Sequence, residues 1–558
     1  MSDDDVQSDD EGAPEEAPPT EASATSSGDF LEDTFGITKA GSTVETELLA
    51  GLTTFLTMAY ILLVNPAMLA VAGIPFDDAL FATAIAAFVG CVVMGLWANK
   101  PFALAPGMGL NAYFTFAVVG AMGIAWEIAL AAVLVEGLIF LILSLPQVGW
   151  RSAMINSIPK DLKIATGAGI GMFLAIIGFR EMGWIQNDGA TLVNLATTEA
   201  FTYDHGAFIS MIGLFAIVIM MARNIKGAII YGIVGMAVIG WIVPGGAYDP
   251  YNDMNGGPGY GNHGGAGWGC EYANWVPVNA TLALQYAADD FTNITDDTEF
   301  GPVVTGDDSK DYVDPDCMYA SAPDEWFGFV GMPEESLGAA FTALGDIDGD
   351  NMGDFLLVMI AFLFVDIFDT SGTLYSVGRQ AGFVNDDDEL EDSDEAFMSD
   401  AAATIVGAAT GTSTTTTYIE SAAGVEEGGK TGLTAVVVGV LMLSGLFFAG
   451  IFKAIPVFAA ATALVVVGAM MMKQARDINW DDAEMAVPAF ITMVMMPFTY
   501  SIADGIAWGL ISYVVIKLGM GKMDKLNPVV NTLAVLMLMF YVGPGDQSTF
   551  DWILSFIF

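Results

Sequence analysis

The chain has 558 residues, of which 54% are hydrophobic and 15% are charged, and its formal net charge is -49. This composition excludes an ordinary soluble globular domain and is typical of a polytopic membrane protein. The acidic residues gather in three polar segments, 1–36, 244–354 and 386–395, so the apolar part is almost neutral. Exposed acids with few lysines predict a host with molar salt, which screens their mutual repulsion.

Hydropathy predicts an all-α protein with about fourteen membrane-spanning segments. In chain order they are expected at 45–72, 79–98, 101–121, 126–145, 161–180, 206–222, 226–243, 354–379, 397–410, 412–427, 430–450, 455–472, 484–500 and 502–518. A further apolar stretch, about 528–543, could cross the bilayer, re-enter it or lie along its surface. The sequence does not decide between these alternatives.

The distribution of basic residues predicts the orientation in the membrane. A cytoplasmic N-terminus places most of the 17 Lys and Arg residues inside, in short loops between spans. The same orientation puts the acidic tail 1–44 in the cytoplasm and the long loop 244–353 outside a cell membrane. Cys270 and Cys317 share this loop and could pair in an oxidising exterior.

Two acids lie within the predicted eighth span, where an ionisable group is costly and therefore suggests a functional site. Asp366, Asp369 and Thr373 have the spacing i, i+3 and i+7, which predicts one helical stripe facing a single cavity. Two carboxylates one turn apart would repel each other in a poorly solvated cavity, so one is expected to hold a proton near neutral pH. The alternative is that these acids cap a broken helix or pair with hydroxyls.

Two spans are interrupted by residues that break helices. The stretch Gly411-Thr-Ser-Thr-Thr-Thr-Thr417 can satisfy an unwound backbone, and Glu420 is expected about one and a half turns into the helix that follows. Residues 102–113 contain Pro106, Gly107 and Gly109, which break the third span just before Asn111. These are the third and tenth spans, so each is the third span of a seven-span half. Interrupted spans at corresponding positions predict an inverted repeat, with the binding site between its two halves.

Several motifs together resemble a known family. They are 36–66, Ala105-Pro-Gly-Met-Gly-Leu-Asn-Ala-Tyr113, Val365-Asp-Ile-Phe-Asp-Thr-Ser-Gly-Thr-Leu374, Thr417-Tyr-Ile-Glu-Ser-Ala-Ala-Gly424 and 496–505. Over about residues 34–525 the chain resembles the AzgA-like hypoxanthine, guanine and adenine permeases of the nucleobase–cation symporter-2 group. The outer loop is longer than this resemblance would lead one to expect.

The resemblance implies two inverted seven-span repeats with short strands in spans 3 and 10, moving as an elevator, and often a homodimer. The core would comprise 45–145 and 354–450, the gate 161–243 and 455–518, and an apolar segment 519–558 would follow. The implied activity is proton-coupled uptake of purine bases. The residues expected to bind substrate are Gly109, Asn111, Asp366, Asp369, Thr373, Tyr418, Glu420 and Ser421.

Among these, Asp366, Asp369 and Glu420 are the expected proton-coupling residues, and sodium could take the place of the proton. No enzyme activity, cofactor, metal site or nucleic-acid partner is expected; the partners are a purine base and membrane lipid. Carboxylates can accept hydrogen bonds from the ring N–H groups of a flat, neutral purine. An anion exchanger of the same fold stays open, although three acids oppose an anion, as does a purine receptor that does not transport.

Overall fold

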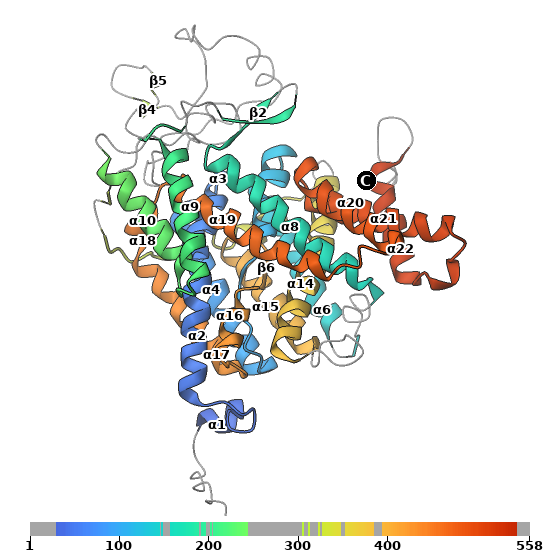
Figure 1. Cartoon of the computed structure of the whole chain (residues 1–558), viewed down its shortest axis with the longest axis horizontal. Helices are drawn as coiled ribbons and strands as arrows, with labels where there is room; N and C mark the ends of the chain where they lie inside the picture. Colours follow the sequence, from blue (N-terminus) through green and yellow to red (C-terminus); the bar gives the residue numbers. More distant parts are fainter. Residues whose placement is uncertain are drawn as a thin grey trace, which may run out of the picture.

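The structure is a computed structural model that describes residues 30–145, 147–148, 157–188, 191–196, 201–203, 205–243, 304–305, 311–312, 322–323, 326–347, 352–383 and 393–543. The expected Cys270–Cys317 disulfide and most of the loop 244–353 lie outside these residues. The described part is mostly helical, as predicted, and its helices form one bundle (Figure 1).

The first half of the chain contains nine α-helices, two π-helices and three short strands within the described residues. These are α1 (Phe30–Phe35), α2 (Val44–Met58), α3 (Ile61–Val71), α4 (Phe76–Val93), the π-helix η1 (Met94–Ala98), β1 (Leu104–Pro106), α5 (Met108–Ala112), the π-helix η2 (Tyr113–Ala121), α6 (Trp126–Ser144), α8 (Lys160–Glu181), β2 (Ile185–Asp188), β3 (Leu192–Leu195), α9 (Gly206–Ala222) and α10 (Ala228–Ile242).

The second half is also mainly helical. It comprises β4 (Val304–Thr305), β5 (Asp311–Tyr312), α13 (Ala339–Gly345), α14 (Met352–Ala381), α15 (Ser393–Thr410), β6 (Thr415–Thr417), α16 (Ser421–Glu426), α17 (Gly432–Met442), η6 (Leu443–Phe447), α18 (Ala449–Lys453), α19 (Val457–Met472), η7 (Lys473–Asp477), α20 (Ala483–Thr499), α21 (Ile502–Gly519), η8 (Met523–Lys525) and α22 (Pro528–Tyr541).

The chain is a multi-pass membrane protein. Among the described residues, six helices are long and apolar enough to cross a bilayer by length and composition, and several shorter apolar helices accompany them. The predicted total of about fourteen spans, and their relation by an inverted repeat, stay predictions. The apolar stretch that the sequence left undecided forms α22, which packs against α21.

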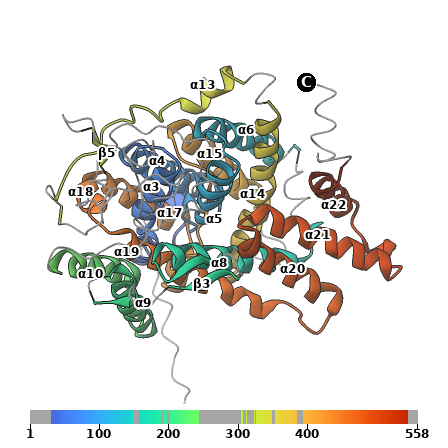
Figure 2. The ribbon, with the colours of Figure 1, turned by 90° about the horizontal axis from the view of Figure 1, so that it is seen from above.

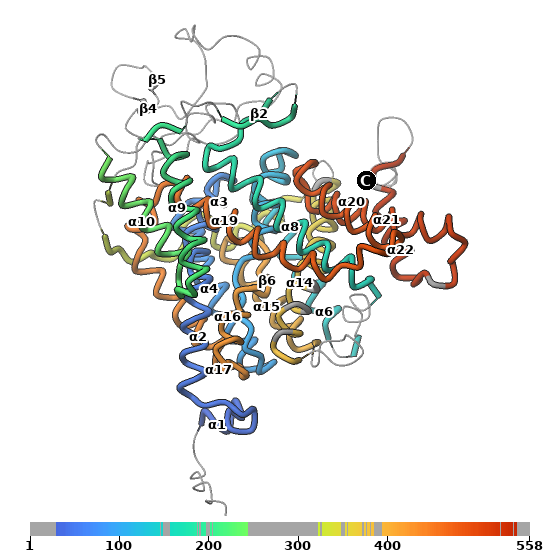
Figure 3. Tube along the Cα trace, in the orientation of Figure 1, coloured from blue at the N-terminus to red at the C-terminus, as the bar shows by residue number. Residues whose placement is uncertain are grey.

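The two broken spans meet as a pair of short strands, which confirms the strands expected in them. β1 pairs antiparallel with β6, so that Ala105 lies opposite Thr416, and both strands are completely buried. Gly107 N donates to Thr414 O at 2.9 Å, which extends the pairing by one residue. Buried backbone that leaves a helix needs such partners, because no water is available inside the bilayer. Figures 1 and 3 show β6 in the middle of the bundle.

The helices fall into two groups, and the strand pair packs within one of them, against α4, α14 and α15. Seen from above, α3, α4, α5, α6, α14, α15 and α17 lie together, while α8, α9, α10, α19, α20 and α21 line one side of them (Figure 2). Helices α8 and α19 approach closely at two glycines, since a Cβ on Gly171 would lie 2.6 Å from Gly468 O. The division into core and gate by residue range stays a prediction. The different functions of core and gate stay a prediction as well.

Candidate functional site

A small cavity lies where the two broken spans face α8, α14 and α19. Its volume is about 40 Å³, which is far below the roughly 300–1,000 Å³ of ligand pockets, so its walls must separate before a heterocycle can enter. No Lys, Arg or His lines it. The cavity is lined by Tyr60, Gly107, Met108, Gly109, Ile170, Leu174, Asp369, Thr373, Thr416, Thr417, Tyr418, Ile419, Glu420, Val467 and Met471.

Glu420 is the residue immediately before α16, and it lines this cavity. The expectation that it lies one and a half turns into a helix is wrong, because β6 ends at Thr417 and the helix begins only at Ser421. Its carboxylate Oε1 accepts a hydrogen bond of 2.6 Å from the Tyr60 hydroxyl. Both side chains are only 2% exposed. Glu420 is therefore held in one direction by a partner from the first span.

Sequence reasoning missed Tyr60 as a site residue. It lies between α2 and α3, where the first span is interrupted, and this interruption turns its hydroxyl toward α16. A signal was present, since a tyrosine in the middle of an apolar span needs a partner for its hydroxyl. Nothing in the local sequence indicates that the partner is 360 positions away.

Tyr418 and Ser421 flank Glu420 in the sequence, and both form hydrogen bonds to the segment around β1. The Tyr418 hydroxyl donates to Pro106 O at 2.5 Å, and its ring borders the cavity. Ser421 Oγ accepts a hydrogen bond of 2.9 Å from Ala103 N and does not line the cavity. Both residues therefore hold the third and tenth spans together, and of the two only Tyr418 can also touch a bound molecule.

Gly109 and Asn111 have different surroundings although they share α5. Gly109 lines the cavity, and a Cβ there would lie 2.7 Å from Ile170 Cγ2, so only glycine allows this approach of α8. Asn111 is fully buried away from the cavity and accepts a hydrogen bond from the Ser413 hydroxyl. Asn111 joins the two broken spans, and its contact with a ligand stays a prediction.

The three polar residues of α14 do not all face the cavity, contrary to the expected single stripe. Asp369 and Thr373 line it, and Thr373 Oγ1 donates to Asp369 O at 2.9 Å. Asp366 is absent from the lining and is completely buried. Helical spacing gives the angular position of Asp366 correctly, but seven residues separate it from Thr373 by about 10 Å along the axis. It therefore lies at another depth.

Asp366 belongs instead to a buried cluster between α14 and α15. Thr370 Oγ1 donates to Asp366 Oδ1 at 2.8 Å and lies 3.1 Å from Asp400 Oδ2. A hydroxyl has one hydrogen, so it can donate to only one of these carboxylates at a time. Asp400 was missed because the acidic residues just before α15 make it look like the end of a solvated patch. The signal was that mostly apolar residues surround it, from Ala396 to Ala403.

The inner cavity therefore combines two carboxylates with apolar walls. Asp369 comes from α14, and Glu420 comes from the broken tenth span. Asp369 and Glu420 can accept hydrogen bonds in the plane of a flat ring, and Ile170, Leu174 and Met471 can cover its faces. Among the described side chains, no group of three His, Cys, Asp or Glu residues could hold a metal ion. Such an arrangement suits recognition of a neutral heterocycle.

Comparison with known proteins identifies the family. The model of the permease family matches residues 45–251 and 352–508. The adenine permease AdeP of Escherichia coli is 34% identical over 92% of this chain and 96% of its own, and the guanine/hypoxanthine permease PbuO of Bacillus subtilis is 35% identical over 90% and 99%.

A solved structure supports the fold. The transmembrane domain of the cyanobacterial bicarbonate transporter BicA matches with a TM-score of 0.51 and 13% identity, over 83% of this chain and 97% of that domain. At this identity the likeness concerns the fold alone. The family match and the relatives that align over almost their whole length confirm the resemblance drawn from the motifs: the chain belongs to the permease family.

Proposed function

We propose that this protein is a secondary active transporter that takes up purine nucleobases, namely hypoxanthine, guanine or adenine, together with a cation. The names of its relatives support the substrate class. The observation that carries the proposal is the pair Asp369 and Glu420 in one small cavity with apolar walls. A purine offers ring N–H donors to these acceptors and two flat faces to the walls.

Within this proposal the two acids have different tasks. Glu420, oriented by Tyr60, binds the base, and Asp369 exchanges a proton with the solution on each side of the membrane. The cluster of Asp366, Thr370 and Asp400 lies behind Asp369 and contributes further negative charge to the same region. The coupling ion is thus proposed to be H⁺, with Na⁺ as the alternative.

The lining of the small cavity supports alternating access by an elevator motion. Its walls come from the predicted core, including β6 and α14, and from the predicted gate helices α8 and α19. If the core slides along the gate, the site opens to one side and then to the other while its core residues keep their mutual positions. We propose this motion with the N-terminus in the cytoplasm and with the cell membrane as the location.

An anion exchanger on the same fold is the less favoured alternative. The likeness to the bicarbonate transporter concerns the fold alone. The inner cavity contains two carboxylates and no basic side chain in its lining, so it would repel an anion. This charge arrangement favours a neutral substrate.

Uptake of radiolabelled bases into vesicles tests the proposal. A panel of purines, uracil and bicarbonate is offered under a pH gradient or a sodium gradient, each applied alone. Purine accumulation driven by the pH gradient is expected, and Glu420→Gln is expected to abolish it. Glu427→Gln is the matched control, because Glu427 is at the surface and pairs with Lys226 at 2.7 Å.

Two outcomes would contradict the proposal in different ways. Accumulation that follows only the sodium gradient would replace the proton with sodium and leave the substrate unchanged. Purine uptake that persists in Glu420→Gln at normal membrane abundance would refute the assignment of the site.

A further inference from the structure

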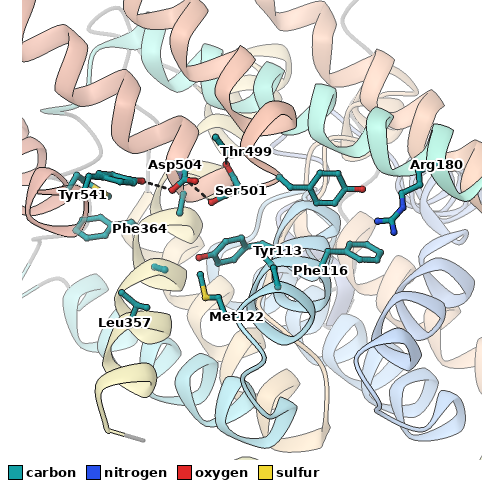
Figure 4. Close-up of a pocket in the computed structure, with 16 residues that line it drawn as sticks. Tyr113, Phe116, Met122, Arg180, Leu357, Phe364, Thr499, Ser501, Asp504 and Tyr541 are labelled. Carbon is teal, nitrogen blue, oxygen red and sulfur yellow. Dashed lines mark hydrogen bonds between the residues drawn. The ribbon is translucent and has the colours of Figure 1, made fainter. Parts of the chain in front are cut away.

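A second and much larger cavity lies near the first. It has a volume of about 600 Å³ and is bounded by η2, α14, α22 and the turn between α20 and α21 (Figure 4). This volume falls within the roughly 300–1,000 Å³ of pockets that hold small molecules. None of the residues assigned above to the substrate site lines it.

The two cavities follow one another along the same two helical segments. Tyr113 lines the large cavity and comes four residues after Gly109 of the small one, which is about 6 Å of helix. Phe364 lines the large cavity and precedes Asp369 on α14 by five residues, or about 7.5 Å. In the proposed topology the large cavity lies on the extracellular side, which is the side from which substrate would arrive.

The large cavity is lined by several polar side chains, among them Arg180, Thr499 and Ser501, and two others, Asp504 and Tyr113, suit a heterocycle. Asp504 Oδ1 accepts a hydrogen bond of 2.5 Å from the Tyr541 hydroxyl, and within the described part of the chain its Oδ2 accepts none. The Tyr113 hydroxyl likewise makes no hydrogen bond to the described residues and points into the cavity (Figure 4). A carboxylate oxygen and a hydroxyl can bind a ring N–H and a ring carbonyl or nitrogen.

The position of Asp504 is fixed by the local backbone. Tyr500 adopts a left-handed conformation, with φ of 56°, and ends α20. Ser501 then caps α21 by accepting a hydrogen bond of 3.2 Å from Asp504 N. This tight turn holds the carboxylate at the cavity wall.

The walls suit a flat ligand. Phe116 and Tyr500 both line the cavity, with ring centroids 6.4 Å apart and planes at 84°. Tyr500 also contacts Phe173 edge to face at 5.6 Å, so the rings are held in place by packing. Aromatic walls with a few polar groups are typical of sites for aromatic heterocycles.

We propose that the large cavity is a second purine-binding subsite, in which Asp504 and Tyr113 hold the base about one to two helical turns outside the inner site. The inference rests on the proposed function, because it assigns to the same substrate a position on its way to Asp369 and Glu420. A lipid chain could also fill a cavity of this size, but its binding would not depend on the Asp504 carboxylate.

Equilibrium binding of radiolabelled hypoxanthine to the purified full chain in nanodiscs tests the subsite. Wild type is expected to bind two bases per chain, and Glu420→Gln one base with weaker affinity. Adding Asp504→Asn to Glu420→Gln is expected to weaken the remaining binding about tenfold, the loss typical for a hydrogen bond to a charged group. Asp524→Asn, which changes an exposed acid on η8, is the matched control in both backgrounds.

A second variant covers the case in which Asp504→Asn does not fold. Ala361→Trp fills the large cavity from α14 and leaves Asp504 in place, and it is expected to remove the same residual binding. Equal residual binding in Glu420→Gln with and without either change would overturn the subsite, as would one base per wild-type chain. If wild type neither binds nor transports any purine, the proposed function itself fails, and the two failures are thereby distinguished.

Discussion

The hydrogen bond between Tyr60 and Glu420 offers a sharp test of the inner site. Tyr60→Phe keeps the ring and removes only the hydroxyl that donates to Oε1 at 2.6 Å. Both side chains are 2% exposed, so water cannot readily replace the donor. A hydrogen bond to a charged group contributes about 1.5–3 kcal/mol, which corresponds to about a 10- to 150-fold loss of purine affinity if the carboxylate must keep this orientation.

The measurement is purine uptake as a function of concentration, together with equilibrium binding to the purified protein. Tyr513→Phe is the matched control, because Tyr513 is similarly buried in α21 and its hydroxyl makes no hydrogen bond to the described residues. We expect KM to rise in Tyr60→Phe and to stay unchanged in Tyr513→Phe at equal membrane abundance. An unchanged KM and binding constant in Tyr60→Phe would refute the reasoning that this contact orients Glu420 for the base.

Asp369→Asn is expected to abolish accumulation driven by a proton gradient while counterflow of labelled purine persists, because exchange needs no net proton movement. Accumulation that survives in vesicles would exclude Asp369 as the coupling residue. Asp366→Asn is expected to weaken binding itself in the same assays, and unchanged binding would contradict a role for the buried cluster. Gly432→Ala is expected to destabilise the protein by about 1–3 kcal/mol, since its Cβ would lie 1.9 Å from Gly95 O. Thermal unfolding measures this change against Gly235→Ala, whose Cβ would meet nothing within 4 Å, and equal stability would contradict it.

The interruption of the two spans could be predicted from the sequence because it has local causes. Pro106 and Gly107 do not continue a helix, and the run of threonines from Thr414 to Thr417 has β-branched side chains that suit a strand. An unwound backbone in the bilayer must then find partners, and the other interrupted span supplies them. The motifs also identified the family correctly, since the family match and the relatives cover the segments that contain them.

The detailed contacts of the site could not be predicted in the same way. Periodicity places Asp366 and Thr373 on one side of a helix, but it does not say how far along the helix the cavity extends. The contacts of Glu420 with Tyr60 and of Asn111 with Ser413 join residues that are hundreds of positions apart. Such pairs depend on how the helices pack, which a single sequence does not reveal.

The pairing of β1 with β6 also has a consequence for how the protein is made. The two strands are roughly 300 residues apart in the chain, and ribosomes add about 5–20 residues per second, so β1 waits about 15–60 s for its partner. During that time its amide and carbonyl groups need a substitute, from water in an unfinished bundle or from the insertion machinery. We therefore expect the third span to reach its paired structure only after the tenth has been synthesised, and truncation before β6 should leave the nascent first half exposed to quality-control proteases.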